Sequence, residues 1–307
     1  MGRIAVIGSN MMDLVTYVNR MPHPGETLEA PSFEMGHGGK GANQAVAAAK
    51  LGGEVLMLTK VGDDAFADAT IRNLAALGVD VKHVGRVAGR SSGVATIIVD
   101  ANGENSILIV KGANNDLKPA DIEAAAEDLK ACDLILLQLE IPLETVYAAI
   151  AFGKRHGVKT LLNPAPAPPD LDASRVKDAT FIVPNETELA ILSGLPVGTV
   201  EEIAHAARSL IAKGAGTLIV TMGGRGALLV SADATTPIAP APVTPVDTTG
   251  AGDAFIGSFA RYFVAGDSLE TALGKAARYA ADSITRRGAQ KSYATEGDFL
   301  TSAQESD

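Results

Sequence analysis

Short apolar runs alternate with amphipathic segments of helical length along most of this 307-residue chain. Such runs are typical of strands buried on both faces, and a helix between two of them supplies the crossover that parallel strands need. The alternation therefore predicts an α/β fold built on a mostly parallel sheet. Strands are expected at Ile4–Ile7, Val55–Val61, Leu134–Leu139, Thr160–Leu162, Phe181–Val183 and Thr217–Thr221. The expected helices include Ala42–Leu51, Pro119–Lys130, Leu143–His156, Ala254–Val264 and Leu269–Arg286, the last with Gly288 as its C-cap.

A polar residue that could bind a ligand follows four of the expected strands. These residues are Asp13, Glu140, Asn163 and Asn185. In an open α/β sheet, ligands bind beyond the carboxyl ends of the strands, which all meet at one edge. Each residue alone could belong to an ordinary turn, but together they predict a binding site at that edge.

The stretch 246–253 joins a proline-rich connector, Pro237–Pro245, to the next expected helix. Its two glycines allow the backbone to approach a ligand closely, and free N–H groups at a helix start favour an anion. We therefore expect an anion site formed by the unpaired N–H groups of Gly250, Ala251 and Gly252.

Asp253 follows these residues and would repel a bound phosphate, so its carboxylate suits a different role. It can take the proton from a hydroxyl group that attacks the phosphate. The alternative is an ordinary helix start, in which Thr248 or Thr249 caps the helix and the acidic residue only favours its dipole.

The segment Gly36–Gly41 reads G-x-G-x-x-G, the pattern of dinucleotide-binding loops. It does not directly follow the first strand, and no acidic residue ends a second strand about 20 residues later, so a nicotinamide-dependent oxidoreductase is a distant alternative. It is not a Walker A motif either, because Gly41 follows Lys40 where Ser or Thr is required. The glycines can pack a helix closely on the sheet, with Asn43 either capping that helix or binding hydroxyl groups.

Asn185 and Glu188 place an amide and a carboxylate three residues apart at a helix start. This pair could hold Mg²⁺ through water together with phosphate oxygens, because Mg²⁺ usually keeps several of its waters. It also matches a capping box, and the two interpretations are compatible.

Two β-like runs, Ser92–Val99 and Asn105–Val110, flank the hairpin signal Asn102-Gly103 and interrupt the strand–helix alternation. With Leu14–Val18 and part of Thr27–Met35 they could form a small separate sheet. A two-stranded hairpin alone is marginally stable, so a cover over the site or a dimer contact would explain it.

The chain carries a net charge of −10, which argues against a nucleic-acid or anionic-membrane surface. Its single cysteine, Cys132, excludes an intrachain disulfide and a cysteine-based zinc site, and we expect it in the core. The N-terminus lacks a signal-peptide pattern and no apolar run reaches membrane-spanning length. A cytoplasmic location is expected.

The strings Asp247-Thr248-Thr249-Gly250-Ala251-Gly252-Asp253 and Gly38-Gly39-Lys40-Gly41-Ala42-Asn43-Gln44 resemble the two signature motifs of the ribokinase-like (PfkB) carbohydrate kinase family. The resemblance covers essentially the whole chain. It implies one kinase domain over residues 1–307, a three-layer αβα sandwich with a mostly parallel sheet, and a small β lid. The lid would comprise about residues 14–37 and 92–111, would close on the sugar, and would form a homodimer.

The resemblance also implies a role for each matching residue. Asp253 would be the catalytic base, with Gly250, Ala251 and Gly252 as the anion hole for the γ-phosphate of ATP. Sugar contacts would come from Asp13, Gly39, Lys40, Asn43 and Glu140. The nucleotide and Mg²⁺ would be held by Asn185, Glu188, Thr221, Gly223, Gly226 and Gly252. An activating K⁺ ion would be bound by Asp247, Thr249, Ser283, Arg286, Gly288 and Ser292, several of them through backbone carbonyl groups.

Met11 departs from the usual ribokinase pattern, which has Asn two residues before the sugar-binding Asp. A thioether cannot hydrogen-bond a sugar hydroxyl as Asn does, and an apolar contact suits a deoxy position. The string 8–17 and the segment Lys111–Asn114 are similar to family members that act on 2-deoxy-D-ribose. We therefore expect transfer from ATP to the C5 hydroxyl of 2-deoxy-D-ribose, with D-ribose as a weaker substrate. The alternatives are D-ribose as the main substrate, or a non-catalytic sugar-binding regulator.

Overall fold

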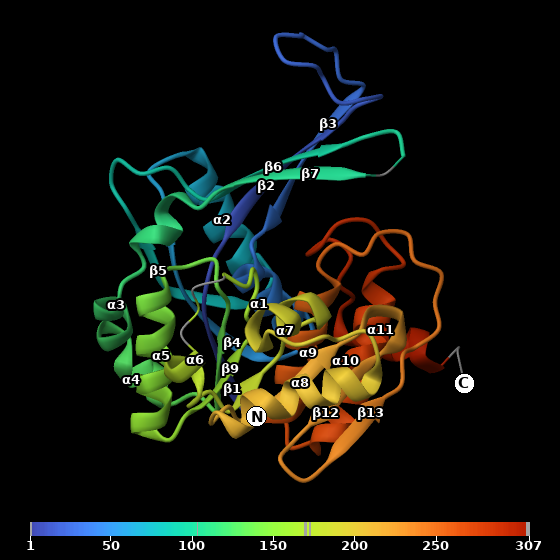
Figure 1. The fold of residues 1–307 in the computed structure, drawn as a ribbon. Coiled ribbons are helices and arrows are strands. Elements are labelled where there is room, and N and C mark those ends of the chain that lie inside the picture. The colour runs from blue at the N-terminus through green and yellow to red at the C-terminus, as the bar shows by residue number, and fades with distance from the viewer. Residues whose placement is uncertain (1, 103, 169–170, 172, 305–307) are drawn as a thin grey trace.

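The computed structural model describes residues 2–102, 104–168, 171 and 173–304, and is built on a nine-stranded sheet (Figure 1). The strand order is β13-β12-β11-β10-β9-β8-β1-β4-β5, and all neighbours are parallel except the antiparallel pairs β11–β12 and β12–β13. Its strands are β1 Arg3–Ile7, β4 Glu54–Val61, β5 Val79–Arg86, β8 Leu134–Leu137, β9 Lys159–Leu162, β10 Phe181–Ile182, β11 Thr217–Thr221, β12 Ala227–Val230 and β13 Thr235–Ile238.

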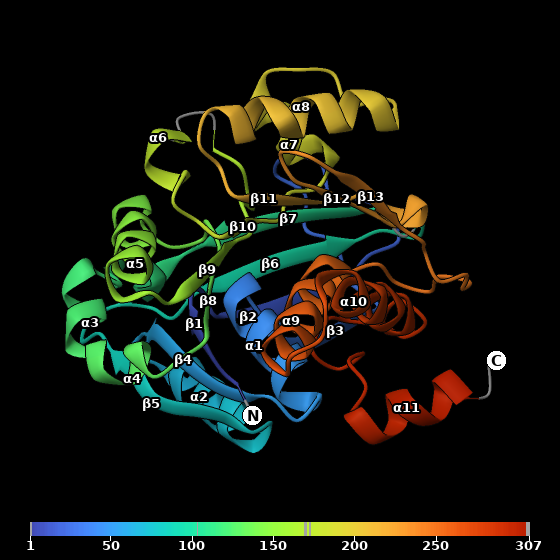
Figure 2. The ribbon, with the colours of Figure 1, turned by 90° about the horizontal axis from the view of Figure 1, so that it is seen from below.

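Helices cover both faces of this sheet, which gives the three layers that the family resemblance implied (Figure 2). The strand residues alternate between the two cores, so that Ile4 and Val6 face one core while Ala5 and Ile7 face the other. One face carries α1 Lys40–Lys50, α2 Ala65–Ala76, α9 Ala251–Val264, α10 Leu269–Ser283 and α11 Glu296–Gln304. The other face carries α3 Pro119–Ala124, α4 Ala126–Lys130, α5 Leu143–His156, α6 Ala173–Val176, α7 Glu186–Ser193 and α8 Val200–Ala212.

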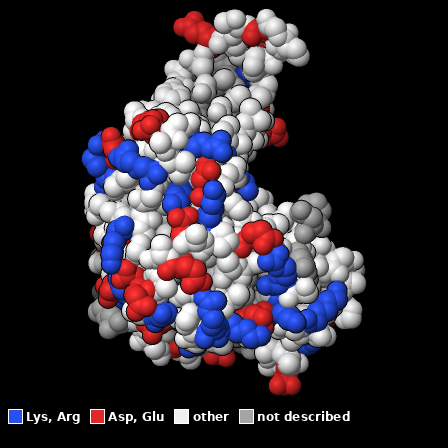
Figure 3. Space-filling model, turned by 90° about the vertical axis from the view of Figure 1, so that its left-hand side faces the viewer, with Lys and Arg blue, Asp and Glu red and all other residues white. Residues whose placement is uncertain are grey.

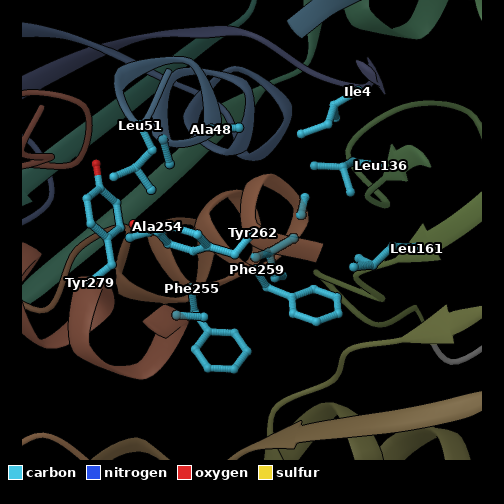
Figure 4. Close-up of a cluster of buried hydrophobic side chains, with 14 of the residues drawn as sticks. Ile4, Ala48, Leu51, Leu136, Leu161, Ala254, Phe255, Phe259, Tyr262 and Tyr279 are labelled. Atoms are coloured by element: carbon cyan, nitrogen blue, oxygen red, sulfur yellow. The ribbon is translucent and has the colours of Figure 1, made fainter. Parts of the chain in front are cut away.

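The helix α9 is buried along most of its length, between α1 and α10. Phe255, Phe259 and Tyr262 of α9 contribute to the core on this face of the sheet, together with Leu51, the C-cap of α1 (Figure 4). Gly257 fits against α1, because a Cβ there would lie 2.4 Å from the carbonyl oxygen of Gln44. This close packing fixes the N-terminal ends of α1 and α9 relative to each other.

A second sheet of four strands, ordered β3-β2-β6-β7, projects from the body (Figure 1). Within it β2 pairs parallel to β6, and the outer pairs are antiparallel. Gly103 of the expected hairpin turn lies outside the described residues. The strands are β2 Met11–Tyr17, β3 Ser32–Gly38, β6 Val94–Val99 and β7 Asn105–Val110, and they fall within or close to the ranges expected for the lid.

Three local expectations were wrong. The segment expected as one helix from Pro119 is two short helices, α3 and α4. The proline-rich connector begins later than expected, because Pro237 lies in β13, an edge strand where a missing N–H is tolerated. Gly288 is not the C-cap of α10, which ends at Ser283 with Ile284 as its cap. Cys132 is buried, as expected. Within the described part of the chain, no helix is both long and apolar enough to span a bilayer.

Candidate active site

The carboxyl ends of β9, β10 and β11 and the N-terminus of α9 enclose a cavity of about 200 Å³. The polar residues that follow these strands therefore meet at one edge of the sheet, as the sequence predicted. The polar lining comes from Lys40, Asn163, Asn185, Glu188, Thr221, Thr248 and Asp253, together with the backbone of Gly250, Ala251 and Gly252.

The start of α9 is shaped by glycine rather than by a capping side chain. Gly250 is the N-cap with φ +76°, and a Cβ there would lie 2.6 Å from the hydroxyl of Tyr293. The alternative of an ordinary helix start capped by Thr248 or Thr249 is wrong, because no side chain caps this helix. At Gly252 a Cβ would meet no atom within 4 Å, so this residue borders open space in the cavity.

The expected anion site is only partly free. The N–H of Ala251 donates to the carbonyl of Thr248 at 3.2 Å, so the prediction of an unpaired N–H is wrong at this residue. The N–H groups of Gly250 and Gly252 donate no hydrogen bond within the described residues. These two groups, at the positive end of the α9 dipole, are the ones that could bind an anion.

Asp253 is 6% exposed, and both of its carboxylate oxygens accept hydrogen bonds from side chains of α1. Asn43 Nδ2 donates to Oδ2 at 3.0 Å, and Gln44 Nε2 donates to Oδ1 at 3.0 Å. The negative charges of Asp253, and then of Glu140 and Glu188, raise the pKa of Lys40 above its ordinary value despite burial. A cationic side chain therefore lies beside the acid, on the wall of the cavity.

Asp13 and Glu140 bring two further carboxylates to this region. Burial, followed by the negative charges of Glu140 and Asp253, raises the pKa of Asp13 to about 7. The Oε2 atom of Glu140 accepts the N–H of Lys40 at 2.9 Å and the hydroxyl of Ser9. Asp13 was expected in the segment that follows the first strand, but it lies inside β2, because only residues 8–10 separate the two strands. It reaches the site from the second sheet.

The glycines at 38, 39 and 41 are required by the chain's own packing. A Cβ on Gly38 would lie 2.2 Å from Oδ2 of Asp13, and one on Gly41 would lie 2.7 Å from the backbone of Ser9. Gly39 has φ +86°, and a Cβ there would lie 2.8 Å from the backbone of Asn10. These residues bring the start of α1 against the β1–β2 connection and leave space for the Asp13 carboxylate, and they do not form a dinucleotide loop.

Met11 is 2% exposed and lies in β2 opposite Gly38. Side chains two residues apart in a strand project to the same face of the sheet. Met11 therefore lies on the same face of β2 as Asp13, on the face that reaches the carboxylates.

At the other end of the cavity, Asn185 and Glu188 form the capping box of α7. Burial raises the pKa of Glu188, although the N–H of Asn185 and the charge of Lys40 lower it. Its second carboxylate oxygen accepts no hydrogen bond within the described residues and is available to a hydrated cation.

The glycine turn after Thr221 divides into two parts. Gly223, with φ +54°, borders open space, whereas a Cβ on Gly226 would lie 2.1 Å from the carbonyl oxygen of Ile238. Thr221 lines the cavity, but Gly223 and Gly226 do not. The glycine at 226 is thus explained by packing against β13.

The six residues proposed for K⁺ come from two segments that lie side by side. Asp247 accepts the N–H of Thr249 at 2.9 Å and that of Gly288 at 2.8 Å, and these bonds lower its pKa although burial raises it. Arg286 Nε donates to the carbonyl of Ser292 at 2.9 Å. Ser283 is buried at the end of α10.

The fit of this region to K⁺ depends on its oxygen atoms. The carbonyl groups of Asp247, Thr249, Arg286 and Gly288 accept no hydrogen bond within the described residues. Unpaired carbonyl oxygens beside a carboxylate are suitable ligands for a monovalent cation, so these residues fit the ion.

Three glutamine residues near Asp253 were not expected in the site. Gln44, Gln138 and Gln290 are each at most 5% exposed. Gln44 stands in the second signature motif, whereas Gln138 and Gln290 lie in no motif. No sequence pattern links Gln138 and Gln290 to Asp253, because both lie far from it along the chain.

Known proteins are similar to this chain over almost its whole length. A family model described as pfkB family carbohydrate kinase matches residues 1–296. The chain is 60% identical to a deoxyribokinase of Salmonella typhi over 94% of this chain and 95% of that protein. It is 42% identical to a ribokinase of Bacillus subtilis, with the same coverage of 94% and 95%. The structure of Arabidopsis thaliana ribokinase complexed with ribose and ATP has a TM-score of 0.91 at 31% identity, over 98% of both chains.

Proposed function

The chain belongs to the pfkB family of carbohydrate kinases, and we propose that it transfers the γ-phosphate of ATP to the C5 hydroxyl of 2-deoxy-D-ribose. D-ribose would be a weaker substrate. The observation that supports this best is the position of Asp253. Its carboxylate accepts hydrogen bonds from α1, lines the same cavity as Gly252, and is close enough to Asp13 for its charge to raise the pKa of that carboxyl.

Asp253 acts in this proposal as the base that takes the proton of the attacking hydroxyl. The N–H groups of Gly250 and Gly252, with the ammonium group of Lys40, stabilise the negative charge on the transferred phosphoryl group. Asp13 and Glu140 accept hydrogen bonds from sugar hydroxyls and orient the sugar. Positioning and charge stabilisation therefore account for most of the catalysis.

ATP would extend from Gly252 along the cavity towards Asn185 and Thr221. The Arabidopsis relative, complexed with ribose and ATP, supports both ligands for this chain. Mg²⁺ would bind the phosphates and reach Glu188 through water. K⁺ would bind the carbonyl groups around Asp247 and Gly288, where it adds positive charge beside the anion site.

Met11 supports the preference for the deoxy sugar. It presents a thioether on the face of β2 that carries Asp13, and the Salmonella relative at 60% identity is a deoxyribokinase. A buried thioether leaves a 2-hydroxyl without a partner, whereas it packs well against a 2-deoxy carbon.

Met11→Asn tests this preference. Because Asn can accept from and donate to the 2-hydroxyl, kcat/KM for ribose should rise relative to kcat/KM for deoxyribose. The change should correspond to about 1–3 kcal/mol in the difference between the activation free energies of the two sugars. Met11→Leu, which stays apolar, is the matched control and should keep the preference of the unmodified protein. An unchanged ratio in Met11→Asn would mean that another residue selects the sugar.

The substrate itself is tested by ADP release with a panel of sugars. The panel should contain 2-deoxy-D-ribose, D-ribose, ketohexoses, nucleosides and 2-keto-3-deoxy sugar acids. The proposal expects the highest kcat/KM with 2-deoxy-D-ribose. No turnover of either pentose would overturn it, and a higher value for D-ribose would favour the alternative.

We also propose that the second sheet closes over the sugar and joins two copies of the chain. Its projecting strands carry few charged residues (Figure 3). Phe33 and Met35 of β3 and the four residues Ile107–Val110 of β7 are 48–69% exposed, which is an unusually apolar surface for a free sheet. Sedimentation should give twice the chain mass, and Leu108→Lys should give the monomer.

A further inference from the structure

Two series of hydrogen-bonded side-chain amides meet at Asp253, and all of these amides are buried except Asn73, which is half-buried. On one side Asn73 Nδ2 donates to Gln290 Oε1 at 2.8 Å, and Gln290 Nε2 donates to Asn43 Oδ1 at 3.0 Å. Asn43 then donates to Asp253. On the other side Gln138 donates to Gln44 Oε1 at 2.6 Å, and Gln44 donates to Asp253. We call these five amides and Asp253 the carboxamide chain.

The direction of every hydrogen bond in the carboxamide chain is set by Asp253. An ionised carboxylate only accepts, so Asn43 and Gln44 must present their nitrogen atoms to it. Their oxygen atoms then face outward and require donors, which Gln290 and Gln138 supply. On the Gln44 side this series of hydrogen bonds ends at Gln138, whose Oε1 atom is buried and accepts no hydrogen bond within the described residues.

This one-way order suits a group that must stay ionised and hold one orientation. A neutral amide stabilises the carboxylate with a hydrogen bond but cannot give it a proton. Two donors, one on each oxygen at 3.0 Å, also fix the rotation of the Asp253 carboxylate about its Cβ–Cγ bond. The lone pairs of the Asp253 carboxylate that Asn43 and Gln44 do not occupy therefore keep a constant direction.

We propose that Gln44 and Gln290 are positioning residues that fix the Asp253 carboxylate for proton transfer, Gln44 directly and Gln290 through Asn43. This inference builds on the proposed role of Asp253 as base. Gln290 lies on the connection after α10, and its backbone carbonyl accepts from Lys50 Nζ at 2.9 Å. This part of the chain thereby controls an acid that is nearly 40 residues away in sequence.

Gln290→Met gives a direct test, because methionine keeps the length of the side chain but cannot donate to Asn43 Oδ1. Asn43 then loses the donor that fixes its amide, and the Asp253 carboxylate loses its fixed orientation. The kcat of this variant should fall about tenfold, while KM for ATP stays unchanged.

Three comparisons separate positioning from a general loss of structure. Gln290→Leu and Gln44→Leu should lower kcat about tenfold or more, at every pH and with KM for ATP unchanged. Thr145→Val removes another buried hydrogen bond, from Thr145 Oγ1 to the carbonyl of Leu117, and should leave kcat unchanged. An unchanged kcat in Gln290→Met, or an equal change in KM for ATP, would overturn the proposal.

A crystal structure of Gln290→Leu tests the same inference without any sugar. We expect Asn43 to turn and the Asp253 carboxylate to rotate relative to that of the unmodified protein. An unchanged carboxylate would overturn the positioning role, even if the enzyme turns over deoxyribose. A rotated carboxylate in a protein that phosphorylates no pentose would instead support positioning and reject the proposed substrate.

Discussion

Replacing Asp13 by Asn should stabilise the ligand-free protein while it impairs sugar phosphorylation. Burial and the charges of Glu140 and Asp253 raise the pKa of Asp13 from 3.8 to about 7. Between about pH 4 and about pH 7, the Asp13 carboxyl is therefore protonated in the folded protein but ionised in the unfolded chain. The stability from Asp13 is fully present below about pH 4 and is lost as the pH rises through about 7.

The size of the effect follows from the same two values. The difference between 3.8 and about 7, at about 1.4 kcal/mol for each pKa unit, amounts to about 4 kcal/mol. Roughly 3 kcal/mol of this penalty develops between about pH 5 and about pH 8. A buried amide costs about 1–2 kcal/mol of its own, so Asp13→Asn should gain about 2–3 kcal/mol at pH 8. The melting temperature should rise by about 4–6 °C.

Urea unfolding at about pH 5 and about pH 8 measures this directly. The stability advantage of Asp13→Asn should grow with pH, while its kcat/KM for the sugar should fall, because an amide cannot replace a carboxylate that accepts from two hydroxyls. Asp233→Asn, which alters an exposed aspartate in the turn before β13, is the control and should show no such trend. A difference that is independent of pH, or a variant less stable at pH 8, would refute the reasoning.

Two further predictions concern the geometry around the sugar and the cation. Gly38→Ala should raise KM for the sugar about tenfold with KM for ATP unchanged, because the new methyl group would lie 2.2 Å from the Asp13 carboxylate and displace it. Steady-state kinetics with each substrate varied in turn will measure both constants. Equal changes in the two KM values would contradict this prediction. Replacing K⁺ by tetramethylammonium at constant ionic strength should lower kcat, since that larger cation cannot fit between the carbonyl groups around Asp247. Equal kcat values in the two salts would contradict the proposed role of K⁺.

Most of the central sheet could be predicted because its strands are short apolar runs separated by helices. The prediction of α5 as Leu143–His156 is confirmed to the residue. The errors arose where local chemistry competes with tertiary pairing. Pro237 reads as a connector, yet it is accommodated in β13 because that strand lies at the sheet edge. The break between α3 and α4 could not be predicted, because no Gly or Pro stands between these helices.

The site divides in the same way. Asp253 and the glycines of the anion site stand in one contiguous string, so their proximity could be predicted from order alone. The second sheet brings Asp13 to Asp253 from 240 residues away, and its raised pKa depends on burial that only the fold creates. Gln290 could not be predicted, since its contact with Asn43 spans 247 residues and a single amide carries no periodic pattern.

The most direct test of the central claim is ADP release with 2-deoxy-D-ribose by the unmodified protein and by Asp253→Asn. If Asp253 takes the proton of the C5 hydroxyl, the variant should lose about 10²–10⁴-fold in kcat, because the amide keeps the size of the side chain but cannot accept that proton. Its KM for ATP should change little. A variant that keeps near-full kcat would contradict the role of Asp253, whatever sugar the enzyme prefers.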